Sequence, residues 1–300
     1  MDTGPSPRHL PVLLAEVLKH LELQPGDTLV DATLGGGGHA AAAAALLGPT
    51  GRLIGLDRDP SMLARARLRL EALPQPPRFD LLHASFADLR SILDDLAVDR
   101  VDAVLADLGF ASDQIDDPSL GLGFAAEGPL DMRLNPHGPL TAADLLADLP
   151  ERELADLFWK YGEERFSRRI ARRIVTQRDT APLRTTAELA QLVRRCVPRA
   201  GRIDPATRVF QALRIAVNDE QEALAALLAD LPRCLRVGGR AVIISFHSLE
   251  DRPVKHAFRD RLNWQVLTKK PVTPNPEEIE ANPRSRSAKL RAAIHQPALA

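Results

Sequence analysis

The chain has 300 residues and a hydrophobic fraction of 45%, which is enough apolar material for one large or two ordinary domains. Its formal net charge of −1 excludes a protein that binds nucleic acid through a global positive field, so any basic surface must be local. The sequence contains no apolar run long enough to span a bilayer and no recognisable signal sequence, so we expect no membrane association and a reducing, cytoplasmic location. The two cysteines, Cys196 and Cys234, lie far apart in helical patterns and predict buried thiols rather than a disulfide or a metal site.

The first third of the chain alternates strands with helices, which predicts a parallel sheet with both faces covered. Residues 1–9 are expected to form a loose arm, and a first helix to run from Pro11 to about Leu21. The elements expected after it are strands near 28–32, 52–57, 79–84 and 101–106, with helices near 39–47, 60–72 and 87–96 between them.

The alternation stops after this region. Residues 108–139 are rich in Gly, Pro and Asp and predict irregular structure, whereas residues 140–230 are helical in pattern throughout. One expected helix opens at Glu151, a second runs from Glu163 to Arg178, and a third begins at a capping box at 185–188. A further helix, or a pair of helices, is expected from Asp204–Pro205 to about Leu231.

Strand character returns at 240–246 and then at 263–269 and 288–295. The sequence therefore predicts one α/β domain, residues 1–107 and 213–300, interrupted by a helical insertion at 108–212.

The stretch from Asp31 to His39 places four glycines, Gly35 to Gly38, between an apolar strand and a strong helix former. Glycines allow a tight turn and close approach to a ligand, and the following helix N-terminus offers free N–H groups. Asp57 follows the second strand, where a carboxylate can accept both hydroxyls of a ribose. This combination predicts a site for an adenosine-containing cofactor. The spacing of Gly35, Gly37 and Ala40 also fits nicotinamide or flavin enzymes.

Ligands of open α/β sheets bind beyond the carboxyl ends of the strands, where further candidates lie. Asp107 ends the fourth strand and enters a flexible loop, and is the sharpest catalytic candidate. Phe86 follows the third strand and is either an aromatic beside an adenine or a core residue. His247 follows the later strand and is either a functional or a structural histidine, and Glu250 and Asp251 are expected to start the next helix.

The segment from Glu163 to Arg178 is rich in arginine. On one continuous helix, Arg165, Arg168, Arg169 and Arg172 would share a face. This face is either solvated or a phosphate-binding surface, and the pattern alone favours neither.

Several long motifs together resemble one family. They are His9–Leu14, Gly55–Pro60, Gly128–Arg133, Tyr161–Phe166, Pro205–Arg208, Phe210–Ile215, Val217–Asn218, Ser245–Asp251 and Asn282–Arg291. The chain is identified by them as similar to the bacterial ribosomal RNA small-subunit methyltransferase H family, also called MraW. Its members methylate N4 of a cytosine in the decoding centre of 16S rRNA, position 1402 in conventional rRNA numbering.

The resemblance implies a class I methyltransferase fold of Rossmann-like type, S-adenosylmethionine as cofactor, and 16S rRNA in the small ribosomal subunit as partner. It also implies that the inserted helical domain faces RNA. Asp131 and Arg133 are further candidates for holding RNA or the target base. The residues implied in cofactor binding, together with Gly35 of the loop, are Gly37, Gly38, His39, Asp57, Phe86, Asp107 and Gln114.

The chain departs from the family pattern at three places. Phe110 and Ala111 replace a Val and a Ser after the fourth strand, Leu120–Phe124 replaces an Arg-Gly-Phe-Ser-Phe motif, and Asp204 replaces a His.

The predicted chemistry is in-line displacement, in which the cytosine N4 amine attacks a methyl carbon while Asp107 or backbone carbonyls accept hydrogen bonds from its protons. Two rival hypotheses are a nicotinamide-dependent oxidoreductase and a ribosome-assembly RNA-binding protein that retains the cofactor fold. The sequence leaves open whether the protein is a monomer or a homodimer.

Overall fold

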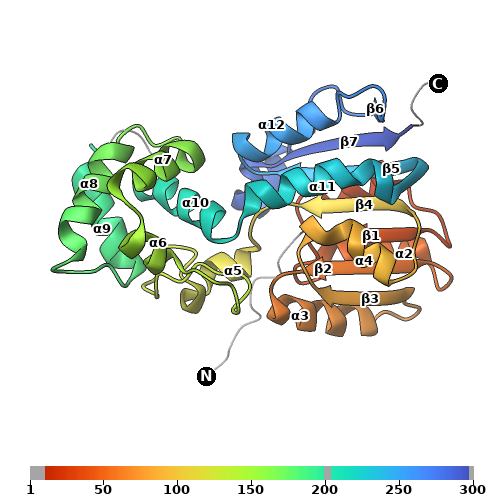
Figure 1. Ribbon diagram of the computed structural model, residues 1–300. Coiled ribbons are helices and arrows are strands. Elements are labelled where there is room, and N and C mark those ends of the chain that lie inside the picture. The colour runs from red at the N-terminus through yellow and green to blue at the C-terminus, as the bar shows by residue number, and fades with distance from the viewer. Residues whose placement is uncertain (1–10, 199–203, 297–300) are drawn as a thin grey trace. The chain divides into compact units, whose positions relative to one another are not determined.

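The computed structural model describes residues 11–198 and 204–296. The chain divides into two compact units, which we call the sheet unit (residues 1–109 and 221–300) and the helical unit (residues 110–220). The sequence predicts an insertion at 108–212, whereas the helical unit covers residues 110–220, so its end lies eight residues later than expected (Figure 1). The arm expected at 1–9 lies outside the described residues.

The sheet unit contains a seven-stranded sheet in the order β3-β2-β1-β4-β5-β7-β6. The first five strands are parallel, and β7 pairs antiparallel with both β5 and β6. The predicted α/β fold with a parallel sheet is confirmed. The strands are β1 (Thr28–Asp31), β2 (Arg52–Asp57), β3 (Arg78–His83), β4 (Val101–Asp107), β5 (Leu235–Ser245), β6 (Trp264–Val266) and β7 (Lys289–His295).

Helices cover both faces of this sheet, as Figure 1 shows. One face buries Val104 and Ile243 against α4 (Leu89–Asp95), α11 (Glu220–Cys234) and α12 (Ser248–Ala257). The other face buries the alternating neighbours Leu105 and Val242 against α1 (Leu14–Leu21), α2 (Gly38–Leu47) and α3 (Pro60–Glu71). Because both faces are covered, these strands are continuous apolar runs rather than alternating ones. The remaining short elements of this unit are the 3-10 helices η1 (Phe86–Asp88) and η3 (Pro283–Ser287) and the helix α13 (Pro276–Ala281).

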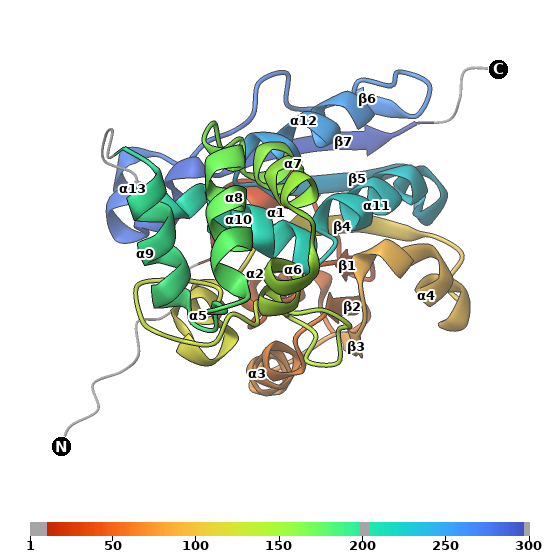
Figure 2. The same cartoon turned by 60° about the vertical axis from the view of Figure 1, so that its left-hand side comes forward.

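The helical unit has its own core, in which Phe158, Phe210 and Leu122 are fully buried. In Figure 2, α8 lies between α7 and α9, and α10 packs against α7. The elements of this unit are α5 (Ser112–Asp116), η2 (Pro118–Leu120), α6 (Ala142–Asp148), α7 (Glu151–Gly162), α8 (Ser167–Arg178), α9 (Thr186–Cys196) and α10 (Ala206–Val217).

Local backbone geometry corrects one expected helix and decides a second. The helix expected from Glu163 begins only at Ser167, because Glu163 adopts a left-handed φ of 49° that ends α7. Of the two forms expected between 204 and 231, the pair of helices is confirmed, because Asp219 has a φ of 50° and separates α10 from α11. Aspartate tolerates this conformation better than most residues, yet neither break carries a glycine or proline signal.

Smaller differences concern element ends. The strand expected at 240–246 starts five residues earlier, at Leu235, and the strand expected at 263–269 is reduced to Trp264–Val266. The capping box at Thr185 and Glu188 starts α9 as predicted. Asp204 accepts a hydrogen bond from the Ala206 amide at 2.9 Å, although Pro205 rather than Asp204 occupies the cap position.

The two cysteines are buried and unbridged, as predicted, and burial raises the pKa of the Cys234 thiol to about 11. Among the described helices, none combines the length and the apolar character that a membrane crossing requires.

The contact between α7 and α10 depends on Gly162. A Cβ at this position would lie 2.5 Å from the Arg208 carbonyl oxygen, which is backbone and cannot rotate away. We expect Gly162→Ala to lower the free energy of unfolding by about 1–3 kcal/mol, because the two helices must separate. Urea unfolding measures this loss. Arg152→Ala, at an exposed position of the same helix, is the control and should change stability by less than about 0.5 kcal/mol. Equal stability of the two variants would contradict the close approach.

Candidate active site

Three aspartates end three neighbouring strands of the sheet. Asp31 is the last residue of β1, Asp57 of β2 and Asp107 of β4. Because β1 lies between β2 and β4 and all three are parallel, these carboxylates share the carboxyl edge of the sheet. This is the edge at which open α/β sheets bind ligands.

The glycine loop follows β1 at the same edge. Gly35 and Gly37 adopt φ values of 50° and 74°, which glycine tolerates without strain. A Cβ on Gly37 would also lie 3.0 Å from the Ala66 Cβ, so both the backbone conformation and the close packing require glycine at this position. A Cβ on Gly38 would lie 2.7 Å from the Pro11 ring. The loop therefore brings bare backbone to the sheet edge, and α2 starts directly from it at Gly38.

Asp57 fixes the glycine loop. Its carboxylate accepts hydrogen bonds from the Gly35 amide at 2.7 Å and from the Asp59 amide at 2.8 Å. Burial raises the pKa of Asp57 to about 6, against the effect of the Asp59, Gly35 and Arg58 amides. A carboxylate can accept about four hydrogen bonds, so Asp57 retains acceptor capacity for a ligand hydroxyl.

Asp107 is the most perturbed carboxyl group of the edge. Its amide donates to Thr33 Oγ1 at 2.6 Å, and its Oδ2 lies 3.7 Å from His39 Nδ1. Its Oδ1 is buried, and no hydrogen-bond partner reaches it from the described residues. Burial, followed by the charges of Asp31 and Glu250, raises the pKa of Asp107 well above its usual range. A buried acceptor without a partner is costly, which makes it a candidate contact for a ligand.

His39 is held in place from the other side. Its Nε2 lies 2.9 Å from the Val12 carbonyl oxygen, and the ring is almost fully buried. The structure therefore places His39 between the segment before α1 and Asp107, within the glycine-loop motif that predicted it.

Sequence reasoning did not single out Asp31 or Glu250 as site residues. Asp31 is 1% exposed, and burial together with the charge of Asp57 raises its pKa to about 7. Glu250 is also buried; its Oε2 accepts from the Phe246 amide at 2.7 Å and its Oε1 lies 3.2 Å from His247 Nε2. Asp31 lay within the quoted glycine motif, so its position at a strand end could have indicated it. Glu250 lies in the first turn of α12, as predicted, but nothing in the pattern indicated that its carboxylate accepts a hydrogen bond from the Phe246 amide before the helix.

The structure brings His247 and Phe86 to defined places in the sheet unit. His247 precedes α12 and contacts Glu250, and the charge of Glu250 contributes to the raised pKa of Asp107. Phe86 opens η1 directly after β3 and is half-buried against the core on one face of the sheet. Both residues are partly exposed.

The other predicted site residues belong to the helical unit. Gln114 is buried and its Oε1 accepts from the Ala111 amide at 2.9 Å. Asp131 and Arg133 form a two-bond ion pair at 2.7 and 2.8 Å, and Arg133 also donates to the Gly138 carbonyl. This guanidinium lowers the pKa of Asp131.

The expected arginine face is smaller than predicted. Arg168, Arg169 and Arg172 are exposed on α8, but Arg165 lies in the turn before it. The cause is the Glu164 side chain, which accepts from the Phe166 amide at 2.7 Å and holds a turn where a helix was expected. Arg172 approaches Glu151 of α7 at 3.3 Å.

A parallel sheet of this strand order with an antiparallel β7, a glycine loop after β1, and acids after β2 and β4 defines a class I S-adenosylmethionine-dependent methyltransferase. The sequence matches the MraW methylase family over residues 6–296. The chain therefore belongs to the MraW methylase family.

Curated relatives agree with this assignment. The ribosomal RNA small subunit methyltransferase H of Koribacter versatilis is 51% identical, covering 96% of this chain and 94% of its own length. The protein of the same name from a Cyanothece species is also 51% identical, covering 97% and 96%. Among solved structures, an rRNA methylase from Streptococcus thermophilus aligns over 98% of this chain and 99% of its own, with 12% identity and a TM-score of 0.45.

The raised pKa of Asp31 predicts a pH-dependent stability. A carboxyl whose pKa is raised on folding binds more protons in the folded than in the unfolded state, so the free energy of unfolding falls as pH rises. For Asp31 this loss occurs between pH 3.8, its ordinary pKa, and the raised pKa of about 7, and it reaches up to about 4 kcal/mol. Asp31→Asn should remove this pH-dependent loss. The free energy of unfolding of the variant should therefore rise relative to that of the wild type between about pH 4.5 and about pH 7.5, and urea unfolding measures the difference.

Asp99→Asn serves as the control, because the Asp99 side chain is 97% exposed. This variant should follow the pH dependence of the wild type. An Asp31→Asn variant that also follows it would show that Asp31 has no raised pKa in the folded protein.

Proposed function

We propose that this protein transfers a methyl group from S-adenosylmethionine to N4 of a cytosine in the decoding centre of 16S rRNA, position 1402 in conventional numbering. The observation that carries the proposal is the buried Oδ1 of Asp107, which lies beside the glycine loop and lacks a partner among the described residues. Membership of the MraW methylase family supports the reaction class. Small ribosomal subunits are the proposed substrate, so the proposed place of action is the cytoplasm.

The residues present fit this cofactor. Asp57 has acceptor capacity for a ribose hydroxyl, and Gly35, Gly37 and Gly38 present bare backbone where a side chain would obstruct a ligand. Phe86 offers an aromatic ring for the adenine, and His39 and Asp107 complete the set that the sheet unit provides. S-adenosylmethionine supplies an electrophilic methyl carbon when it is bound.

Asp107 has the central catalytic role in this proposal. The cytosine amine is a poor nucleophile, because its lone pair is delocalised into the ring. An acceptor for its N–H groups favours the pyramidal geometry in which the lone pair is available. Asp107 Oδ1 is such an acceptor, and its raised pKa makes the ionised carboxylate a stronger base for the proton that leaves.

Glu250 and His247 are positioning residues in the same proposal. Glu250 is held by the Phe246 amide and contacts His247, and its charge contributes to the raised pKa of Asp107. The pair therefore sets the basicity of Asp107 without needing to touch substrate.

We assign RNA recognition to the helical unit. Exposed arginines on α8 suit phosphate contacts, and a base must leave its stack to reach a catalytic carboxylate. Asp131 and Arg133 saturate much of each other's hydrogen-bonding capacity, so their proposed role is to shape the loop that holds RNA, with the remaining Arg133 donors available to it.

Asp107→Asn tests the catalytic assignment. Substitution by the neutral isostere removes the proton acceptor, so methyl transfer to small subunits should fall by about 10²–10⁴-fold. Subunits from a strain that lacks the enzyme, labelled cofactor and mass mapping of the modified nucleotide provide the measurement. Calorimetric titration of the cofactor separates a loss of binding from a loss of chemistry, and Asp99→Asn is the control. Unchanged methyl transfer in Asp107→Asn would refute the assignment.

The same assay separates the proposal from its rivals. Tight binding of a dinucleotide with no heat from S-adenosylmethionine would identify an oxidoreductase. Binding of small subunits without any methyl transfer would identify an assembly factor.

Glu250→Gln tests the positioning role. Removing the buried charge should lower the pKa of Asp107, so the acidic limb of the pH–rate profile should move to lower pH. The profile of single-turnover methyl transfer measures the shift. Glu277→Gln, at an exposed position of α13, should leave the profile in place. A Glu250→Gln variant that loses rate equally at every pH would indicate a structural role only.

A further inference from the structure

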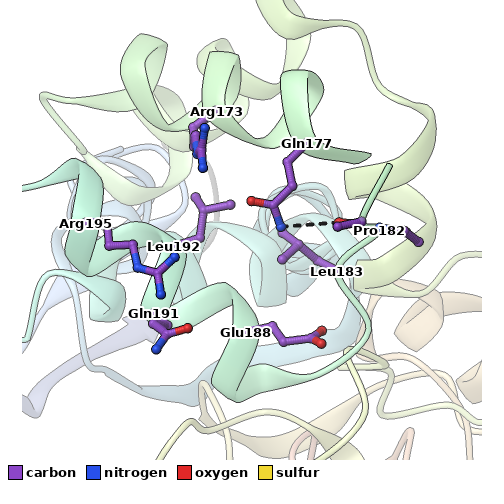
Figure 3. Close-up of a pocket in the computed structure, with 9 residues that line it drawn as sticks. Arg173, Gln177, Pro182, Leu183, Glu188, Gln191, Leu192 and Arg195 are labelled. Atoms are coloured by element: carbon purple, nitrogen blue, oxygen red, sulfur yellow. Dashed lines mark hydrogen bonds between the residues drawn. The ribbon is translucent and has the colours of Figure 1, made fainter. Parts of the chain in front are cut away.

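A small pocket lies in the helical unit between α8, the loop that follows it, and α9 (Figure 3). Its volume is about 110 Å³. Since a water molecule in the liquid occupies about 30 Å³, the pocket has room for a group the size of a few waters. It is smaller than the roughly 300–1,000 Å³ of sites for whole cofactors.

The floor of the pocket is apolar and its rim is polar. Leu183 and Leu192 are buried at the floor, beside Ala181 and Pro182 of the loop. The polar lining residues are Arg173, Gln177, Glu188, Gln191 and Arg195. The loop that closes one side is fixed, because Gln177 donates to the Ala181 carbonyl at 3.2 Å and the capping box of α9 follows it.

Arg173 extends from α8 and Arg195 from α9, and Figure 3 shows both directed toward the cavity. In the described part of the chain, neither guanidinium has an acidic group within salt-bridge distance, whereas the adjacent Arg194 is paired with Asp204 at 2.8 Å. Glu188 also faces the pocket, but its carboxylate accepts from the amides of Arg184 and Thr185 at 2.8 and 3.0 Å. The rim therefore carries two guanidiniums without a salt-bridge partner in the described ranges and one carboxylate that already accepts hydrogen bonds from two backbone amides.

We propose that this pocket is a binding site for one backbone phosphate of the RNA substrate. Two guanidiniums that converge from different helices can hold one phosphate through paired N–H donors, as arginine does elsewhere. The Gln177 and Gln191 amides lie beside them, and the apolar floor suits the ribose or base of the same nucleotide. Phosphate contacts fix the register of a protein on RNA without reading its sequence. The site would thus orient the substrate rather than select the target base.

This inference rests on the proposed function and names a contact that the arginine face of α8 alone did not indicate. Arg173 was not among the residues expected to bind RNA, and Arg195 lies on a different helix. An RNA phosphate is favoured over a protein carboxylate because the chain belongs to the MraW methylase family, and the relatives that it matches are named as ribosomal RNA methyltransferases.

The experiment compares the full-length wild type with the double variant Arg173→Gln/Arg195→Gln in binding small ribosomal subunits over a range of salt concentrations. Loss of one neutralised phosphate reduces the slope of log K against log salt by about 0.7–0.9. We expect this reduction, together with affinity that is about tenfold weaker, and unchanged calorimetric affinity for S-adenosylmethionine. A second variant, Gln191→Glu, places a carboxylate at the rim and should weaken subunit binding while leaving cofactor binding intact.

Arg152→Gln is the matched control, because it removes a guanidinium from an exposed position of α7 in the same unit. Its slope and affinity should equal those of the wild type. A double variant that also equals the wild type in both quantities overturns the proposal. So does a double variant that binds subunits normally but loses affinity for a polyglutamate peptide, since the pocket would then recognise protein carboxylates.

Free phosphate is distinguished by adding inorganic phosphate at constant ionic strength. Tight binding of this ion alone, without any effect of the variants on subunit binding, would indicate a site for a small anion and overturn the assignment to RNA. Failure of the proposed function gives a different result, because the wild type itself would then fail to methylate small subunits. If the wild type also fails to bind them, the phosphate site is refuted as well.

Discussion

Burial of three neighbouring carboxylates is the constraint on which the site depends. Asp31, Asp57 and Asp107 end adjacent strands, and the topology leaves them no freedom to separate. Each has its pKa raised, mainly by burial and also by the charge of a neighbouring acidic group. Such an edge is unfavourable in the ionised protein and is relieved by a ligand that brings hydroxyl donors or positive charge. The sheet thus holds a cost in the free protein that selects for that kind of ligand.

The glycine loop is the complement of this cluster. Its amides are the fixed donors of the edge, and one of them, from Gly35, already bonds to Asp57. A side chain on Gly37 would displace α3 at Ala66, so the loop cannot be loosened without moving the sheet unit around it. Rigid backbone and buried charge therefore act together: the loop fixes where a ligand can approach, and the carboxylates determine which atoms it must present.

Sequence reasoning captured what depends on local pattern. The strand ends that carry Asp57 and Asp107, the glycine loop and the capping box of α9 were all predicted from neighbouring residues. It missed features decided by side chains that reach across a turn. Glu164 bonding to the Phe166 amide moves Arg165 off α8, and Glu250 turns back to the Phe246 amide. Hydrogen bonds of this kind compete with helix formation and leave no periodic signal.

Side-chain packing explains how the helical unit accommodates the departures from the family pattern. Leu122 is fully buried in its core, and Phe124 packs on Phe210 with ring centroids 4.8 Å apart. Phe110 lies under the Arg214 guanidinium at 5.3 Å. These residues pack on α10, whose end is fixed by Asn218 through the Met132 carbonyl and the Leu134 amide. Asn218 thereby ties α10 to the loop of Asp131 and Arg133, so a change in packing beside α10 is transmitted to the segment proposed to hold RNA.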